Sequence, residues 1–313
     1  MEFVFSKKYY LGFLLNNMQQ FANIFMPLSI ALIMFGIGLE LNFSNFRRVF
    51  THPRAIITGL ASQLFLLPII AFLLIYFWPI DPVYKIGVML LAACPGGTAS
   101  NLVTKMLRGR VALSVSLTAF NSFIILFSIP LVVQFSFMVF GKEEQSFSLT
   151  FGETMSDVLF TVILPVVAGI LLNEFFGYKF GDKLHKALQY ILPGIMLLAF
   201  IVVIFFDESQ QNVKYFEHLN LFIPLIILNY ATIIVGYLVS RRLKLKHSSA
   251  YTIAIEMGLQ NSVLALFIAN QVLKDKDISL VAILYSSFSL ITTFVGGWIL
   301  KNYFGKKADR KLK

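Results

Sequence analysis

One acidic side chain, Glu256, lies within an apolar stretch from residue 248 to 272 that contains no other charged residue. The stretch is long enough to cross a bilayer as a helix. A carboxylate at such depth is costly unless it is paired or holds a cation, and we expect no lysine or arginine near it. A bound cation or proton is the expected partner, and a protonated glutamic acid bonded to a neighbouring helix is the alternative. Gln260 follows four residues later on the same helix face, with Asn261 beside it.

Neutral oxygen-bearing side chains form a stripe on a second apolar stretch, 111–140. The spacing i, i+4, i+7 and i+8 places its members on one helix face: Ser114, Thr118, Asn121 and Ser122. Any one of these groups, or Gln63 on a third stretch, can instead bond within its own helix or at a helix interface. Together with one carboxylate, such oxygens suit a hard monovalent cation better than calcium, which usually collects several carboxylates.

A third pattern predicts an interrupted helix. Pro95, Gly96 and Gly97 are consecutive within an apolar stretch, and Thr98, Ser100 and Asn101 follow them. Proline removes a backbone hydrogen bond and glycine weakens a helix, so we expect a break in mid-membrane. A simple proline kink is the alternative, and the polar residues after it favour a binding site.

The composition indicates an all-helical membrane protein. Of the 313 residues, 58% are hydrophobic and 13% are charged, whereas soluble domains carry about 25% charged residues. The mean hydropathy is +0.78. The basic residues lie between apolar runs, so the net charge of +10 predicts no nucleic-acid partner. One cysteine, no HExxH helix and no paired nucleophile and base argue against an enzyme.

The hydropathy pattern predicts nine membrane spans. They are expected near 21–41, 55–77, 84–107, 111–140, 150–175, 187–206, 218–240, 248–272 and 278–304. One set of flanks, with the C-terminal tail, holds 19 basic residues and the opposite set holds 7, so the C-terminus is expected in the cytoplasm and the N-terminus outside. The first 20 residues are expected to form an interfacial or partial helix.

A short internal repeat links two of these spans. Residues 97–103 and 258–264 both have a glycine, then a polar pair three and four residues later, then aliphatic residues. The two copies are five spans apart, so they must have opposite orientation in the membrane. Inverted repeats with interrupted helices are typical of secondary transporters.

These segments resemble the bile acid:sodium symporter family. The resemblance rests on Cys-Pro-Gly-Gly-Thr-Ala-Ser-Asn at 94–101, Ala-Leu-Ser-Val-Ser at 112–116 and Glu-Met-Gly-Leu-Gln-Asn-Ser at 256–262. The Met-Phe-Gly-Ile-Gly-Leu segment at 34–39 and the pattern of His52-Pro53, Gln63 and Pro68 are similar as well. It runs from about residue 27 to the C-terminus.

The resemblance implies a sodium-coupled symporter of the cell (inner) membrane, with two bound sodium ions. One ion would be held by Ser100, Asn101, Ser114, Thr118 and Glu256, and the other by Gln63, Gln260, Glu256 and the carbonyls of Met257 and Leu259. The substrate would be an organic anion, bile acid-like or another small amphipathic acid, near Thr98 and Asn261.

The resemblance also implies one transmembrane unit, 1–313, with two parts that work by alternating access. A core of two inverted units with crossing, discontinuous helices would comprise 55–140 and 218–304. A panel would comprise 21–41 and 150–206. We expect a monomer or a weak dimer in the lipid bilayer.

Other functions stay open at this point. Glu256 could carry a proton in a proton-coupled carrier or a sodium/proton antiporter. A receptor that binds an anion is a further class, although the loops and tail leave little room for a signalling domain. Intramembrane hydrolysis would need a nucleophile and base that the spans lack.

Overall fold

A computed structural model describes residues 53–141, 159–175 and 215–304, together with Ser156, Ile191 and scattered positions between 28 and 39. None of these residues lies in a strand, so the predicted all-helical class is confirmed for this part of the chain. The first 20 residues, the span expected at 187–206 apart from Ile191, much of that expected at 21–41 and the start of that expected at 150–175 lie outside it.

Four helical runs are long and apolar enough to cross a membrane. They are Pro53–Tyr76, His218–Arg242, His247–Asn270 and Lys276–Phe304. A fifth, Val111–Phe140, bends by 66° between Ser122 and Phe127. Pro130 lies just beyond the bend, and its ring removes the hydrogen bond that would run back across it. The described part of the chain is therefore that of a multi-pass membrane protein.

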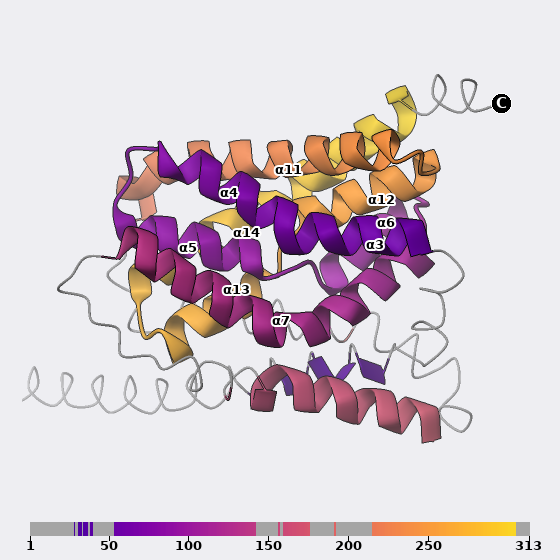
Figure 1. Ribbon diagram of the computed structural model, residues 1–313, viewed down its shortest axis with the longest axis horizontal. Coiled ribbons are helices and arrows are strands. Elements are labelled where there is room, and N and C mark those ends of the chain that lie inside the picture. The colour runs from indigo at the N-terminus through magenta and orange to yellow at the C-terminus, as the bar shows by residue number, and fades with distance from the viewer. Residues whose placement is uncertain are drawn as a thin grey trace, which may run out of the picture.

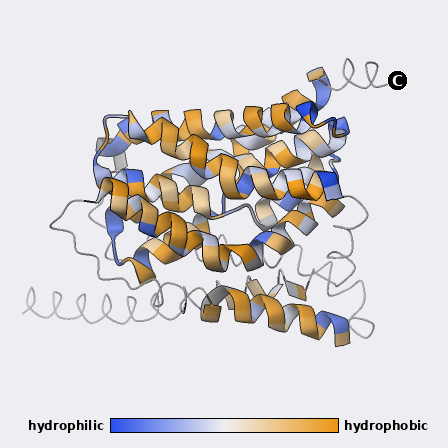
Figure 2. Ribbon diagram, in the orientation of Figure 1, coloured by the Kyte–Doolittle hydropathy of each residue, from blue (hydrophilic) through white to orange (hydrophobic). Residues whose placement is uncertain are grey.

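Within the described ranges the elements are all helices, several of them joined by very short connections (Figure 1). In chain order they are α3 (Pro53–Ala61), η1 (Ser62–Leu66), α4 (Leu67–Tyr76), α5 (Pro82–Ala93), α6 (Thr98–Met106), α7 (Val111–Phe140), η2 (Leu159–Ile163), the helix Leu164–Phe175, η3 (Tyr215–Leu221), α11 (Phe222–Arg242), α12 (His247–Gly258), α13 (Ser262–Phe267), η4 (Ile268–Val272), α14 (Lys276–Ile299) and η5 (Leu300–Phe304). α11 packs along α12, and α5 packs against α7 and α14. Apolar residues cover most of these helices (Figure 2).

A widened turn interrupts the first of the long runs. η1 is a π-helix, and the N–H of Leu67 after it donates to Ser62 O, five residues back. Pro68 explains the change locally, because it has no N–H to bond the residue four positions before it. π-turns of this kind are frequent at functional sites, and this one carries Gln63.

Two glycines allow the described positions from 34 to 39 to pack closely on the helix Leu164–Phe175 (Figure 1). A Cβ on Gly169 would collide with Phe35 O and would lie 2.8 Å from Leu39 N. A Cβ on Gly38 would collide in the same way with Val166 O. Backbone lies on both sides of this contact, so no side-chain movement could make room for a larger residue.

Gly169→Val is therefore expected to lower the thermal midpoint of the purified protein in detergent, since overpacking costs about 1–3 kcal/mol. Ala168→Val is the matched control, because Ala168 is exposed on the same helix and the variant should melt like the wild type. Equal midpoints for both variants would contradict the close packing of these segments.

Candidate functional site

The site begins where two interrupted helices meet. α5 ends at Ala93 and α6 begins at Thr98, so the break expected at Pro95–Gly97 is confirmed. A second break separates α12 from α13. The N–H of Asn261 in that break donates to Cys94 O in the first, at 3.0 Å. Backbone groups freed in mid-membrane must find hydrogen-bond partners within the protein. Here the second break provides the donor and the first break provides the acceptor.

Glycine is required at this crossing. A Cβ on Gly96 would lie 2.6 Å from Leu259 O and 3.3 Å from Glu256 O, both on the backbone of the other interrupted helix. A Cβ on Gly97 would meet nothing closer than Asn261 Nδ2 at 3.5 Å, an ordinary contact. The first glycine therefore lets the chains cross closely, and it brings two carbonyl oxygens of the second break to the first.

Glu256 is fully buried beside this crossing. Its Oε1 accepts a hydrogen bond from the Ser114 hydroxyl, and that hydroxyl also lies 2.6 Å from Asn101 Oδ1. One hydroxyl has one proton, so it can donate to only one of these acceptors at a time. Three oxygens thus converge around a single proton, which is an arrangement that favours a cation.

Several buried oxygens on α7 and at the end of α12 have no hydrogen-bond partner among the described residues. They include Thr118 Oγ1, one turn after Ser114, Glu256 Oε2, and Gln260 Oε1, one turn after Glu256. Leaving a buried polar group unsatisfied costs about 1–3 kcal/mol. Ser100 also lies close to the carboxylate, and its hydroxyl donates to Gly97 O at 2.8 Å. All these groups are the oxygen ligands that hard cations prefer.

Side-chain amides contact the backbone carbonyl oxygens in the last turn of α12, just before the break. Gln63 Nε2 donates to Glu256 O at 3.3 Å, and Gln260 Nε2 donates to Met257 O at 2.7 Å. Asn121 Nδ2 donates in turn to Gln63 Oε1 at 2.5 Å. The structure therefore brings the widened turn η1, the stripe on α7 and the α12 break together at one place.

Some predicted residues have a different role. The hydroxyl of Ser122 donates to Thr118 O at 2.8 Å, within its own helix, so this member of the predicted stripe is occupied. Asn261 is the N-cap of α13, where its Oδ1 accepts from Leu264 N at 3.1 Å. Thr98 is the first residue of α6. Both residues proposed for substrate thus begin the second half of an interrupted helix.

Sequence reasoning missed a buried group that holds the end of α12. The Gly258 carbonyl accepts hydrogen bonds from Asn229 Nδ2 at 2.7 Å, the Tyr285 hydroxyl at 2.7 Å and the Thr293 hydroxyl at 3.0 Å. A signal was available, because Asn229 is polar within an apolar span and Tyr285 and Thr293 lie eight residues apart, on one helix face.

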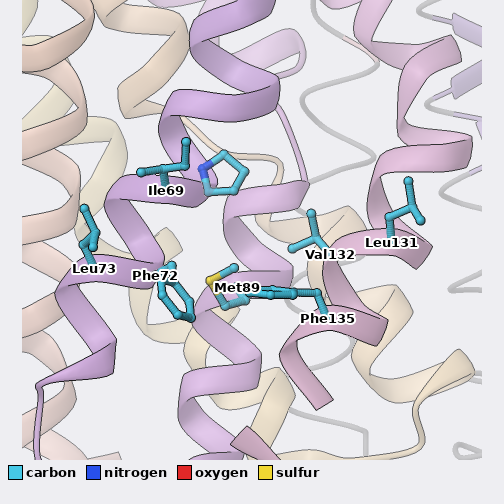
Figure 3. Close-up of a pocket in the computed structure, with 8 residues that line it drawn as sticks. Ile69, Phe72, Leu73, Met89, Leu131, Val132 and Phe135 are labelled. Carbon is cyan, nitrogen blue, oxygen red and sulfur yellow. The ribbon is translucent and has the colours of Figure 1, made fainter. Parts of the chain in front are cut away.

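An apolar pocket of about 280 Å³ lies between α4, α5 and α7 (Figure 3). Ile69, Phe72, Met89, Leu131 and Phe135 are among its lining residues, and every lining side chain is apolar. Such a pocket offers no ligand to an ion and no donor to an anion. The chemistry of the molecule lies at the helix crossing instead.

Residues 27–215 match the family described as "Sodium Bile acid symporter family". The chain belongs to this family. YocS of Bacillus subtilis, named as an uncharacterized sodium-dependent transporter, is 28% identical over 301 residues, or 96% of this chain and 89% of YocS. The Arabidopsis thaliana protein named "Probable sodium/metabolite cotransporter BASS1, chloroplastic" is 30% identical over 243 residues, 77% of this chain but only 58% of that protein. The human ileal sodium/bile acid cotransporter is 25% identical over 268 residues, 83% of this chain and 74% of its own.

Membership makes this chain part of a family of sodium-dependent membrane transporters, which are not enzymes. The resemblance first read from the motifs around Glu256 is confirmed, and sodium is the ion that the family implies. The oxygens at the helix crossing are chemically suited to that ion.

Gly96→Ala is expected to force the two breaks apart, because the new Cβ would press on the Leu259 carbonyl. The variant should melt at a lower temperature than the wild type and should lose most of its stabilisation by sodium chloride relative to potassium chloride. Gly97→Ala should keep both properties. If Gly96→Ala were stabilised by sodium as strongly as the wild type, the close crossing would not shape the site.

Proposed function

We propose that the protein imports an organic anion together with two sodium ions, by alternating access. The observation that carries this proposal is the surplus of buried oxygens around Glu256, a carboxylate with no basic partner among the described residues. A cation would satisfy the unpaired oxygens and neutralise the carboxylate in one step.

The two ions would share the Glu256 carboxyl group. The first would be bound by Ser100, Asn101, Ser114, Thr118 and Glu256, and the second by Gln63, Gln260, Glu256 and the carbonyls of Met257 and Leu259. The approach of Ser114 to both Asn101 Oδ1 and Glu256 Oε1 supports the first set. The contact of Gln63 with the Glu256 carbonyl supports the second.

Coupling would follow from occupancy. The ions join α6, α7 and α12 into one arrangement, and that arrangement orders the crossing and creates the anion site. In a partly loaded protein a charge would stay buried without a partner, and this would oppose the movement of the core between its outward-open and inward-open states. Each sodium ion adds about 2.3 kcal/mol per 100 mV of membrane potential if its charge crosses the whole field.

The remaining architecture is proposed on the same basis. Nine spans would form one unit, with a core of 55–140 and 218–304 built as an inverted repeat and a panel of 21–41 and 150–206. The close packing of Gly38 on Gly169 supports a panel made of segments far apart in sequence. The N-terminus would lie outside and the C-terminus in the cytoplasm, and the protein would be a monomer or a weak dimer.

The substrate is proposed to be a bile acid-like or another small amphipathic organic acid. Relatives are named for bile acid, metabolite and organic anion transport. Thr98 and Asn261 would contact it, because each begins the second half of an interrupted helix and helix N-termini favour negative charge.

A proton carried by Glu256 is the competing explanation. One proton would satisfy the carboxyl group alone, and it would leave Thr118 Oγ1 and Gln260 Oε1 without partners. A sodium ion needs several oxygen ligands, so it accounts for these groups as well. The unpaired oxygens therefore favour sodium over a proton-coupled carrier or a sodium/proton antiporter.

Thr118→Val tests this explanation directly, since it removes an unpaired hydroxyl and almost no volume. In potassium chloride the variant should be as stable as the wild type or more stable, because a buried unsatisfied group is lost. Its affinity for sodium should fall about tenfold, equivalent to about 1.4 kcal/mol. Thermal midpoints measured across a sodium titration report both quantities.

Two further variants serve as controls for that measurement. Glu256→Gln should abolish sodium stabilisation, while Ser116→Ala should leave it unchanged, because the Ser116 hydroxyl donates to Ala112 O within its own helix. Unchanged sodium affinity in Thr118→Val would exclude this hydroxyl as a ligand. In proteoliposomes without added substrate, a pH gradient dissipated by sodium would favour the antiporter.

A screen of organic acids against the wild-type protein should identify the substrate class. True substrates should raise the thermal midpoint in sodium chloride and have little effect in potassium chloride, because ion and anion binding are reciprocally coupled. Their uptake into proteoliposomes should then stop when potassium replaces sodium. Uptake that continued unchanged would overturn the proposed symport.

A further inference from the structure

Three helices begin around a second pocket, at one end of the bundle. α3 begins at Pro53, α7 at Val111 and α12 at His247. The pocket between these ends has a volume of about 320 Å³, within the range of about 300–1,000 Å³ that is usual for ligand sites. It shares no lining residue with the apolar pocket of Figure 3, and its chemistry is different.

Four of the eight residues that line this pocket are basic: Arg54, Arg110, Lys244 and Lys246. None of the lining residues is acidic, and the first turns of α3, α7 and α12 contain no acidic residue either. Like charges held this close repel one another. The positive ends of three helix dipoles add to the same field, so a bound anion would stabilise the whole arrangement.

Ser249 supplies a buried polar group in the pocket wall. Its side chain is 1% exposed, and its Oγ accepts a hydrogen bond from Arg110 Nη1 at 2.9 Å. The Ser249 hydroxyl proton is used in no hydrogen bond within the described part of the chain, so it can be donated to a ligand. Arg110 is itself fixed in place, because its backbone N–H donates to Thr252 Oγ1 at 2.9 Å.

The backbone at Lys244 is left-handed, with a φ of 59°. It follows the C-cap of α11, a position where glycine is usual because it adopts this conformation without strain. A lysine here costs stability in the turn and contributes a positive charge to the pocket.

The ends of three candidate spans place this pocket at the level of a membrane surface. The spans Pro53–Tyr76 and His247–Asn270 begin beside it, and the span His218–Arg242 ends beside it. Figure 2 shows hydrophilic residues at the start of α3 and at the turn between α11 and α12. Phosphate groups of lipids lie at this depth, and arginine and lysine are the side chains that bind phosphate best.

We propose that this pocket binds a phosphate group, presented either by the headgroup of an anionic phospholipid or by free phosphate in solution. The bound group bridges the first turns of α3, α7 and α12. Those helices lead directly to Gln63, Ser114 and Glu256, so the phosphate fixes the ends of the elements that form the helix crossing.

The test uses the full-length protein in nonionic detergent, in potassium buffer at constant ionic strength. One arm titrates inorganic phosphate against chloride, and the other compares phosphatidylglycerol with phosphatidylcholine in mixed micelles. A saturable rise in thermal midpoint is expected in at least one arm. A rise with phosphatidylglycerol alone identifies a lipid headgroup as the source, and a rise with inorganic phosphate identifies free phosphate as sufficient. No rise in either arm overturns the proposal.

Lys244→Gly and Lys274→Gly form a matched pair for the same titrations. Lys274 is exposed, has a φ of 54° and precedes α14 at the opposite end of the bundle. Both variants remove one charge and relieve a left-handed backbone, so neither should be less stable than the wild type without ligand. Lys244→Gly should raise the apparent Kd at least tenfold, and Lys274→Gly should leave it unchanged. Equal effects in the two variants, or none in Lys244→Gly, would mean that charge screening alone stabilises the protein.

Discussion

The burial of the Glu256 carboxylate without a basic partner is the constraint around which the rest of the molecule is arranged. The side chain is fully buried, and the groups around it among the described residues are neutral: the Ser114 hydroxyl donates to it, and Ser100 and Gln63 lie close by. A lysine or arginine beside it would form a permanent ion pair. The protein instead surrounds the carboxylate with oxygens that have too few protons. Such a site is incomplete on its own, and a cation that enters and leaves would complete it.

The two helix breaks provide these oxygens, and they are held very differently. The Gly258 carbonyl is fixed by Asn229, Tyr285 and Thr293, so the end of α12 is anchored to α11 and α14. The carbonyls of Glu256 and Met257 accept instead from the side-chain amides of Gln63 and Gln260. A side-chain amide can give up such a hydrogen bond to an ion without a change in the backbone, so a cation would replace these bonds and leave the anchored Gly258 carbonyl in place.

Local chemistry made much of this predictable from sequence. Pro95 and the two glycines predicted a break, and a lone Glu256 in an apolar span predicted a site. The π-turn at Gln63 was not predicted. The group around Gly258 was missed because it joins residues that lie 27 to 35 positions apart in the sequence. Ser122 shows the opposite limit. Its spacing matched the stripe, yet a serine can bond its own helix, and spacing alone does not reveal which acceptor it uses.

Charge balance explains why the proposed stoichiometry would produce strict coupling. Two sodium ions, the Glu256 carboxylate and one monovalent anion sum to zero, so the fully loaded core would carry no net charge. Two sodium ions bound without the anion would leave the core with a net positive charge. The anion bound without sodium would lie in the same core as the negatively charged Glu256. Both are unfavourable in a low-dielectric interior. In such a cycle the empty core would return with Glu256 alone, and Ser114 would stabilise that state by donating its proton to the carboxylate, as it does in the structure. When sodium binds, the same hydroxyl can turn its lone pairs to the ion, so one side chain would serve both halves of the cycle.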